Sequence, residues 1–388
     1  PPSASWCSEK AKNARDKKVD KGCDTGANVR AWESQGAGNT YDLEGPDAQA
    51  VTMPPAPTIG SDELTAEMAE VYAQALLRDT PFTEFTGCPS GVDGKNQEVD
   101  EIIGELNKLK WFKSDDCCDL TLQEQMRKRD KLTRQTAFRG ITPGDDIGPY
   151  LSQFLLVGDS GLNNAKTPDV KKERQPGDGL ISYGAISIDQ RVRYATPCDD
   201  HMKTWDEWYD VQQGADLRGL ENYEDKPYRR FITTPRDLAT YVHHDALYEA
   251  YLNACLLLLS NKIPFDPGIP FQGDDLIDHQ QGFAHFGGPH ILTLVTEVAT
   301  RALKAVRFQK FNVHRRMRPE VLAARFEKQL DPKCKLKVDE LDDMIKAIGK
   351  GPTSILGRIK SKNGNYLLPM AFCEGSPMHP SYGAGHAT

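Results

Sequence analysis

The sequence lacks a long hydrophobic run. Its longest apolar stretch, Ala254–Leu259, is far shorter than the roughly 20 residues that cross a bilayer, so we predict no membrane span. An excess of positive charge is also lacking, since the 388 residues carry a formal net charge of −8, which argues against nucleic acid as a partner. Compositional bias of the disordered or collagen-like kind is missing too. We therefore expect a globular protein long enough for more than one domain.

Cysteine spacing of the zinc-finger kind is absent as well. The nine cysteines include no CxxC pair, which argues against a structural zinc site, and their odd number leaves at least one unpaired. A few disulfides in an oxidising compartment fit this content. Because the sequence begins with Pro rather than Met, we expect a processed product that is secreted, in the cell wall or otherwise extracellular.

Alternating strand patterns are few, and helical periodicity dominates. The best strand or hairpin candidate is Leu180–Arg193. A helix is predicted after Ser61, a suitable N-cap. Further helices are predicted at Glu98–Phe112, Pro235–Leu259, His290–Arg318 and Val338–Ile348. With no βαβ alternation and no internal repeat, we predict a mainly α fold built of helical bundles with few short strands.

The composition divides the chain into three parts. Residues 1–50 are polar and are predicted to form an extension that contacts another subunit. Residues 51–235 form an N-terminal helical half, interrupted by a long Gly- and Pro-rich surface loop over 158–182. Residues 236–388 are predicted to form the helical bundle that carries the candidate site, with an incomplete C-terminal end.

The most unusual segment is Ala299–Pro319, which holds seven basic residues and no acid in an acidic chain. On one continuous helix, four of its basic side chains would share a face: Arg307, Lys310, His314 and Arg318. Lysine and arginine on one face can bind an oxyanion, the first as a point charge and the second as a bidentate fork. The alternative is a solvated basic face, or one paired with acids from elsewhere.

A second candidate is the C-terminal run Glu374–Thr388. Its small residues Gly383, Ala384 and Gly385 allow the backbone to approach a ligand and point N–H groups at it. Two histidines flank that turn, His379 and His386, and either suits acid–base or anion-contacting chemistry. The alternative is a flexible Gly-rich tail with two incidental histidines.

Taken together, the two segments carry a specific pattern. Lys310-x7-Arg318-Pro319 followed by His379-Pro-Ser-Tyr-Gly-Ala-Gly-His386 resembles the vanadium-dependent haloperoxidases, most closely the bromoperoxidases of marine algae. Other stretches, such as Asp245–Cys255 and Thr296–Val306, look like the red-algal members. The resemblance implies helical bundles of the type shared with acid phosphatases, with vanadate as the cofactor. It also implies hydrogen peroxide, bromide and small organic acceptors as substrates.

The resemblance also implies roles for particular residues. Lys310 and Arg318 would clamp the vanadate, Gly385 would donate its N–H, and His386 would face the apical oxygen as acid–base. Arg307 and His379 would border the approach of the halide and substrate, His379 counting among the catalytic residues. Where many relatives have Ser in the vanadate-binding turn, this chain has Ala384. Losing one donor to a charged group costs ~1.5–3 kcal/mol unless another donor substitutes.

Two further expectations rest on the resemblance. The second arginine and the axial metal-binding histidine have no counterpart here, so we expect the chain to be a fragment of a longer polypeptide. A structural calcium is predicted at Phe271, Asp275 and Asp278, with an acidic helix N-terminus as the alternative. The histidines His243, His244, His279 and His285 show no recognisable metal spacing and are interpreted as structural.

The predicted function is a vanadate-dependent haloperoxidase that oxidises bromide better than chloride. One alternative is a phosphatase using the same oxyanion pocket. Another is a non-catalytic homologue that serves only in assembly, suggested by the missing axial histidine and by Ala384. A homo-oligomer, a dimer or a dodecamer, is expected because the polar N-terminal segment has no core of its own.

Overall fold

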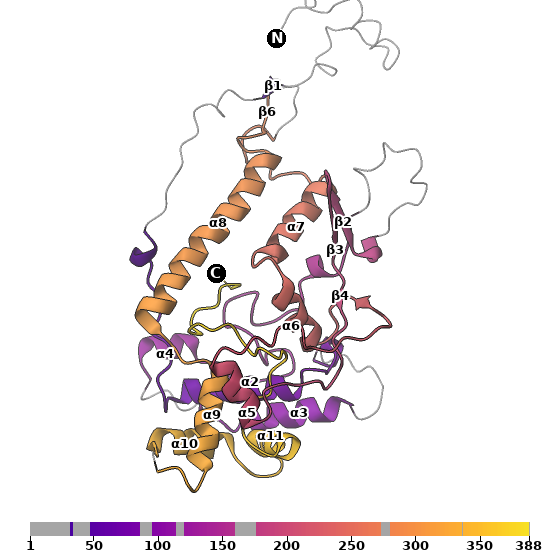
Figure 1. Cartoon of the computed structure of the whole chain (residues 1–388). Coiled ribbons are helices and arrows are strands. Elements are labelled where there is room, and N and C mark those ends of the chain that lie inside the picture. The colour runs from indigo at the N-terminus through magenta and orange to yellow at the C-terminus, as the bar shows by residue number, and fades with distance from the viewer. Residues whose placement is uncertain are drawn as a thin grey trace, which may run out of the picture. The chain divides into compact units, whose positions relative to one another are not determined.

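The computed structural model describes residues 32–33, 47–85, 95–113, 120–159, 176–272, 280–335 and 337–387 (Figure 1). These residues are mainly helical, which confirms the predicted fold class. The helices are α2 (Asp62–Leu76), α3 (Lys95–Leu106), α4 (Leu122–Arg127), α5 (Trp205–Gln212), α6 (Pro235–His244), α7 (Glu249–Ser260), α8 (Gly288–Phe308), α9 (Pro319–Leu330), α10 (Asp339–Ile348) and α11 (Ile355–Asn363). None of the helices in these ranges is both long and apolar enough for a membrane span.

The strands are short and pair two by two. They are β1 (Trp32–Glu33), β2 (Leu180–Tyr183), β3 (Ile186–Asp189), β4 (Val192–Arg193), β5 (Arg229–Arg230) and β6 (Gln280–Gln281). β1 runs parallel to β6, β2 pairs with β3, and β4 is antiparallel to β5. The predicted strand region Leu180–Arg193 is thus confirmed as β2, β3 and β4.

The chain forms two compact units. One comprises Asp47–Val157, Asp189–Leu247 and Leu303–Thr388 and holds every residue of the candidate oxyanion site. The other comprises Pro1–Pro46, Gly158–Ile188 and Tyr248–Ala302, and in it α7 packs against β2. The three-part division at residues 50 and 235 stays a prediction.

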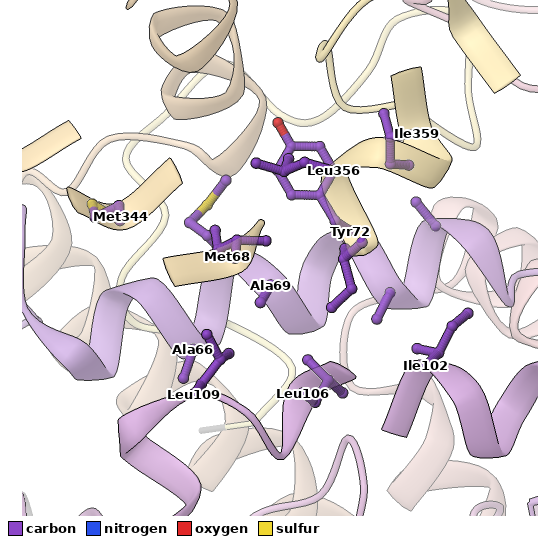
Figure 2. Packing of buried hydrophobic residues seen from close by; sticks show 14 of the residues in the cluster. Ala66, Met68, Ala69, Tyr72, Ile102, Leu106, Leu109, Met344, Leu356 and Ile359 are labelled. Atoms are coloured by element: carbon purple, nitrogen blue, oxygen red, sulfur yellow. The ribbon is translucent and has the colours of Figure 1, made fainter. Parts of the chain in front are cut away.

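The core of the first unit is built around α2. Ser61 caps this helix as predicted, since its side chain accepts a hydrogen bond from the Leu64 N–H at 3.1 Å. α2 packs against α3, α10 and α11. Figure 2 shows the buried side chains of this cluster, among them Met68, Ile102, Met344 and Leu356. Tyr72 is fully buried, and its hydroxyl donates to the Tyr366 carbonyl at 2.6 Å, so the core leaves that polar group satisfied.

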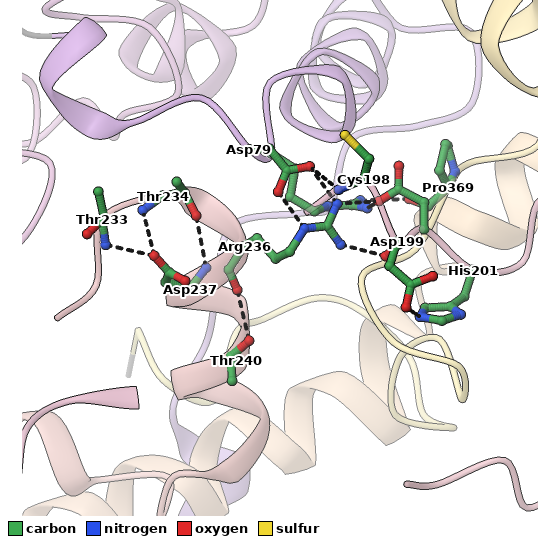
Figure 3. Close-up of polar contacts among 12 residues, drawn as sticks. Asp79, Cys198, Asp199, His201, Thr233, Thr234, Arg236, Asp237, Thr240 and Pro369 are labelled. Atoms are coloured by element: carbon green, nitrogen blue, oxygen red, sulfur yellow. Dashed lines mark hydrogen bonds and ion pairs between the residues drawn. The ribbon is translucent and has the colours of Figure 1, made fainter. Parts of the chain in front are cut away.

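A second fixed point of this unit is an ion-pair network at the start of α6 (Figure 3). The buried Arg236 guanidinium donates to Asp79 at 2.6 Å and to Asp200 at 2.7 Å. Arg78 donates to the same Asp200 carboxylate at 2.5 Å and to the Pro369 carbonyl at 2.7 Å. Burial raises the pKa of Asp200, but Arg78, Arg236 and Lys362 together lower it to about 2. These cations are therefore matched by carboxylates.

Several predicted helices have different ends in the structure. The helix predicted at Val338–Ile348 is confirmed as α10, one residue shorter. The one predicted at Glu98–Phe112 starts earlier and stops at Leu106, followed by a 3₁₀ turn at Lys110–Phe112. The one predicted at Pro235–Leu259 is wrong as a single helix, because α6 ends at His244 and the extended Asp245 follows. Aspartate favours helix ends over helix interiors, and its side chain here binds another segment.

Parts of some predictions fall outside the described residues. Asp275, Asp278 and His279 of the calcium and histidine predictions are among these, as are most of residues 1–50 and residues 160–175 of the predicted surface loop. Phe271 is described, with its ring centroid 6.3 Å from that of His285. Cys198, Cys255 and Cys373 form no disulfide.

Candidate functional site

The two segments singled out by the sequence meet at the junction between α8 and α9. α8 ends at Phe308 and continues as a π-helical turn over Gln309–His314. Arg315 then takes a left-handed conformation with φ +44°, and Arg318 is the extended N-cap residue before Pro319 opens α9. The predicted helix through Arg318 is therefore wrong. Proline fixes the next helix start and keeps the residue before it extended.

Lys310 is the most buried cation of this junction. Its residue is 4% exposed, whereas Arg307, one turn earlier, is exposed. Burial lowers the pKa of the Lys310 ammonium, and the neighbouring Arg318 and Arg307 lower it further. No carboxylate among the described residues forms an ion pair with Lys310 or Arg318. A buried cation without a counter-ion is costly unless a ligand supplies one.

Arg318 is held in place by the C-terminal run. Its Nε donates to the His379 carbonyl at 2.7 Å, and its Nη2 lies 3.1 Å from Nδ1 of the same histidine. Burial lowers the pKa of the guanidinium, yet an arginine remains charged at any physiological pH. Its Nη1 makes no hydrogen bond to any described residue, so part of the donor fork remains available for an anion.

His379 lies beside these cations. Burial lowers the pKa of its imidazole, and Lys310, Arg318 and Arg307 lower it further. A hydrogen bond to the Pro380 carbonyl acts in the opposite direction and raises it. The imidazole is therefore neutral at pH 7. Phe311 packs next to it with ring centroids 6.0 Å apart, and the Arg307 guanidinium lies 5.2 Å above the centre of that phenyl ring. Arg307 and His379 thus flank one aromatic side chain, which the sequence did not single out.

The C-terminal run docks on this junction through its backbone. The Ser381 N–H donates to the Arg316 carbonyl, and its hydroxyl donates to the Met317 carbonyl, both at 3.0 Å. Gly383 follows, buried against Val306 and Met53. A Cβ there would lie 2.5 Å from the Met53 Cε and 3.0 Å from the Val306 Cγ2, so a larger residue would have to displace the Met53 side chain.

His386 has a partner that sequence reasoning missed. Its Nε2 lies 2.8 Å from Oδ2 of Asp245, a carboxylate whose side chain is 4% exposed. An aspartate in this position fixes the orientation of an imidazole. Asp245 lies 141 residues earlier in the chain, so no local spacing could reveal the pair. Next to it, Gly385 is half-buried and Ala384 exposed.

His314, a predicted member of the basic face, and Arg316, which is not, both contact other partners. The His314 ring meets the Tyr382 ring edge-on, with centroids 4.9 Å apart. Arg316 forms an ion pair with Glu67 on α2. A pocket of about 490 Å³ lies between residues 56–59 and 314–317, with Leu64, Met68 and Leu322 in its wall. His314 therefore belongs to the edge of this pocket rather than to the cation cluster.

The geometry defines a class of protein first: a mainly helical chain with buried, uncompensated cations and a neutral histidine, suited to an oxyanion. The sequence is 49% identical over 375 residues to a vanadium-dependent bromoperoxidase from Corallina officinalis, and 30% identical over 353 residues to one from Ascophyllum nodosum. These matches cover 92% and 89% of this chain, and 61% and 56% of the relatives. No family model matches.

A solved structure shares the fold. The homohexameric structure of a second vanadate-dependent bromoperoxidase from Ascophyllum nodosum aligns with a TM-score of 0.64 at 23% identity, covering 93% of this chain and 53% of that one. The resemblance drawn from the motifs is thus confirmed. This chain is a relative of the vanadium-dependent bromoperoxidases, and it spans about 61% of the length of the red-algal relatives that it matches.

Proposed function

We propose that this chain carries the main oxyanion-binding half of a vanadate-dependent haloperoxidase that uses hydrogen peroxide to oxidise bromide. The observation that carries the proposal is the buried Lys310, which has no carboxylate partner among the described residues and lies beside Arg318 and His379. Such a donor set fits vanadate, because a multiply charged oxyanion replaces the missing counter-ion. Relatives named vanadium-dependent bromoperoxidases support the choice of cofactor and halide.

In this proposal each residue has one task. Lys310 supplies a point charge, and Arg318 supplies directed N–H groups whose orientation the His379 carbonyl fixes. The Gly385 N–H is a further donor, and His386, oriented by Asp245, holds or releases a proton at its ring nitrogen. His379 and Arg307 border the halide approach. When bound, vanadate would supply a Lewis acid that activates peroxide toward bromide.

Some finer points belong to the same proposal. We expect a homo-oligomer, supported by the hexameric assembly named for the related structure, and light scattering of the purified protein tests it. A structural calcium near Phe271 and an extracellular location also remain proposals. Because the match spans about 61% of the red-algal relatives, the intact mass of the native protein is a useful measurement beside these tests.

The direct test compares three reactions of the purified full-length protein with and without added vanadate. We expect vanadate-dependent bromination of an organic acceptor, slower turnover of chloride, and negligible hydrolysis of a phosphate ester. Equal chloride turnover near neutral pH would contradict the halide preference. Vanadate-inhibited phosphate-ester hydrolysis without bromination would replace the haloperoxidase by the phosphatase. Vanadate binding without either reaction would favour the assembly homologue.

A further inference from the structure

A cluster apart from the oxyanion site joins three segments that are distant in the sequence. Glu221 comes from the loop before β5, His243 from the last turn of α6, and Glu374 from the segment that leads into the C-terminal run. One ligand atom from each of these residues lies within 4.8 Å of the other two. Among the described residues, this is the one group of three His, Cys, Asp or Glu side chains with such spacing.

The polar atoms of this cluster are incompletely satisfied. The His243 Nε2 lies 2.6 Å from the Glu374 Oε1. The other ring nitrogen of His243, the second oxygen of Glu374 and Oε1 of Glu221 are all buried without a hydrogen-bond partner. Buried polar atoms are nearly always paired, so the two unpaired carboxylate oxygens of this cluster call for a bound group.

The charge balance indicates the sign of that group. Two carboxylates face each other here. Two arginines of this region have other partners: Arg218 pairs with the exposed Asp216, and Arg193 lies 3.7 Å above the Tyr223 ring. His243 alone offsets at most one of the two negative charges. A cation bound by the His243 Nε2 and the two carboxylates would remove the repulsion and satisfy the orphaned oxygens of Glu221 and Glu374.

The backbone around the cluster is held firmly. Residues 222 and 224 bond to the chain at 194–196, which fixes the Glu221 segment. The His243 ring stacks on Phe372 with centroids 3.9 Å apart. Gly375 takes φ +71°, and a Cβ there would lie 2.5 Å from the Met202 sulfur, so the turn that presents Glu374 requires glycine. The three ligands are therefore presented by ordered backbone.

We propose that Glu221, His243 and Glu374 form a binding site for a divalent transition-metal cation of the Zn²⁺ class. One imidazole nitrogen, a borderline ligand, with two carboxylate oxygens is a mixed set that suits Zn²⁺, whereas Ca²⁺ and Mg²⁺ prefer oxygen alone. Ligand atoms around tetrahedral Zn²⁺ lie about 3.4 Å apart, so side-chain shifts of about 1 Å bring the three atoms to the ion. Water completes the fourth position.

Such an ion would link α6 to the C-terminal run. Glu374 lies five residues before His379, and His243 lies two residues before Asp245, the partner of His386. The cation therefore fixes both strands of chain that deliver histidines to the oxyanion site without touching the oxyanion itself. This proposal replaces the interpretation of His243 as purely structural. His244 is still interpreted as structural, and its ring lies 3.2 Å from the Tyr223 hydroxyl.

The test measures metal binding on the full-length protein and needs neither vanadate nor peroxide, so its result is independent of the proposed function. The protein is stripped with a chelator and titrated calorimetrically with Zn²⁺ and, separately, Ca²⁺. We expect one Zn²⁺ per chain, a rise in melting temperature on binding, and Ca²⁺ binding at least 100-fold weaker. Absence of Zn²⁺ binding at 10 to 100 micromolar metal, roughly, would overturn the site and leave a shared proton between the two carboxylates.

Matched variants locate the ion. Glu221→Gln and His243→Ala should each weaken Zn²⁺ binding at least tenfold, while the neighbours Glu224→Gln and His244→Ala should leave it unchanged. Cys373 and His201 lie 3.3 Å apart and offer a rival zinc site, so Cys373→Ser is included. Loss of binding in Cys373→Ser, or equal losses in Glu221→Gln and Glu224→Gln, would assign the ion to other residues and refute the proposal.

Discussion

Two clusters in the same compact unit bury positive charge, and they do so in opposite ways. At the start of α6, Arg236 and Arg78 share the carboxylates of Asp79 and Asp200. At the end of α8, Lys310 and Arg318 are near one another and near His379, and neither forms an ion pair with a carboxylate among the described residues, although the buried Glu320 acts on the Arg318 charge. The first cluster is complete within the chain, and the second is complete only when an anion is added.

The difference teaches how to separate structure from function in a charged interior. A matched network holds elements together and gains nothing from a ligand, whereas an unmatched one makes the apo protein less stable and reserves binding energy for an anion. Whether a buried cation cluster is structural or binds an anion can therefore be judged from the carboxylates that pair with its cations. Five measurements probe this contrast.

The largest effect is expected at Asp200. Replacing it in the Asp200→Asn variant leaves Arg78 and Arg236 buried and undercompensated, which should lower the free energy of unfolding by ~3–5 kcal/mol in urea denaturation. Asp216→Asn is the matched control, because the pKa of Asp216 is also lowered to about 2, by Arg218, but on an exposed surface. We expect no measurable change there, and an equal loss in both variants would contradict the role of burial.

The same carboxylate predicts an acid transition. The folded-state pKa of Asp200 is about 2, below an unfolded value near 3.9, so its stabilisation is present above pH ~4 and is lost as pH falls toward 2. That shift corresponds to ~2.6 kcal/mol, less than most of the range expected for Asp200→Asn, because the substitution also leaves the two arginines without this partner. Stability curves of wild type and Asp200→Asn should converge between pH 4 and 2.

Lys310 gives the next largest effect. Lys310→Ala removes one charge-assisted contact to a bound oxyanion and should weaken vanadate affinity by ~1.5–3 kcal/mol, about one to two decades. Lys304→Ala makes the same substitution at an exposed position on α8 and should bind vanadate normally. Calorimetric titration of the vanadate-free protein measures both. Equal losses in the two variants would show a diffuse electrostatic effect instead of a site.

In the absence of vanadate, removal of the Lys310 charge should not destabilise the protein. Lys310→Met replaces a buried, unpaired ammonium by an apolar side chain of similar length, so the free energy of unfolding should stay the same or rise by up to ~1 kcal/mol. Urea denaturation of vanadate-free protein is the measurement. A clear loss of stability would mean that Lys310 has a partner that completes the cluster within the protein.

The smallest effect concerns the titration of His379. Burial and three neighbouring cations lower its pKa, so Lys310→Met should move that pKa back toward 6.5. Nuclear magnetic resonance of the imidazole proton follows the titration, with Lys304→Ala as the control. An unchanged pKa in Lys310→Met would show that the Lys310 charge does not act on this histidine.

Local signals in the sequence predicted the parts of the fold that depend on neighbouring residues. The cap at Ser61 and the apolar face of α10 follow from spacing of three and four residues, and both are confirmed. The break after His244 and the π-helical turn at Gln309–His314 escaped the same reasoning, because the apolar pattern continues through both. Tertiary contacts decide such breaks.

The candidate site was likewise predicted from the sequence only in part. The motif around Lys310 and the run from His379 to His386 could be found in the sequence, and the structure brings Lys310, Arg318 and His379 together. The shared helical face was wrong, since Arg318 belongs to the next helix. Asp245 and the cluster of Glu221, His243 and Glu374 join residues more than 100 positions apart, and no spacing rule reaches that far.

The docking of the C-terminal run has a consequence for how the site is made ready. Residues 379–387 form bends and turns, and they are anchored by a few contacts such as those of Ser381 to residues 316 and 317 and of His386 to Asp245. Such a segment opens by itself at low cost while the core around α2 stays folded. Opening separates His379 from Arg318, so the apparent affinity for an anion is the intrinsic affinity multiplied by the closed fraction. An anion that bridges the two segments would in turn hold the run shut and slow the exchange of its backbone amides with solvent.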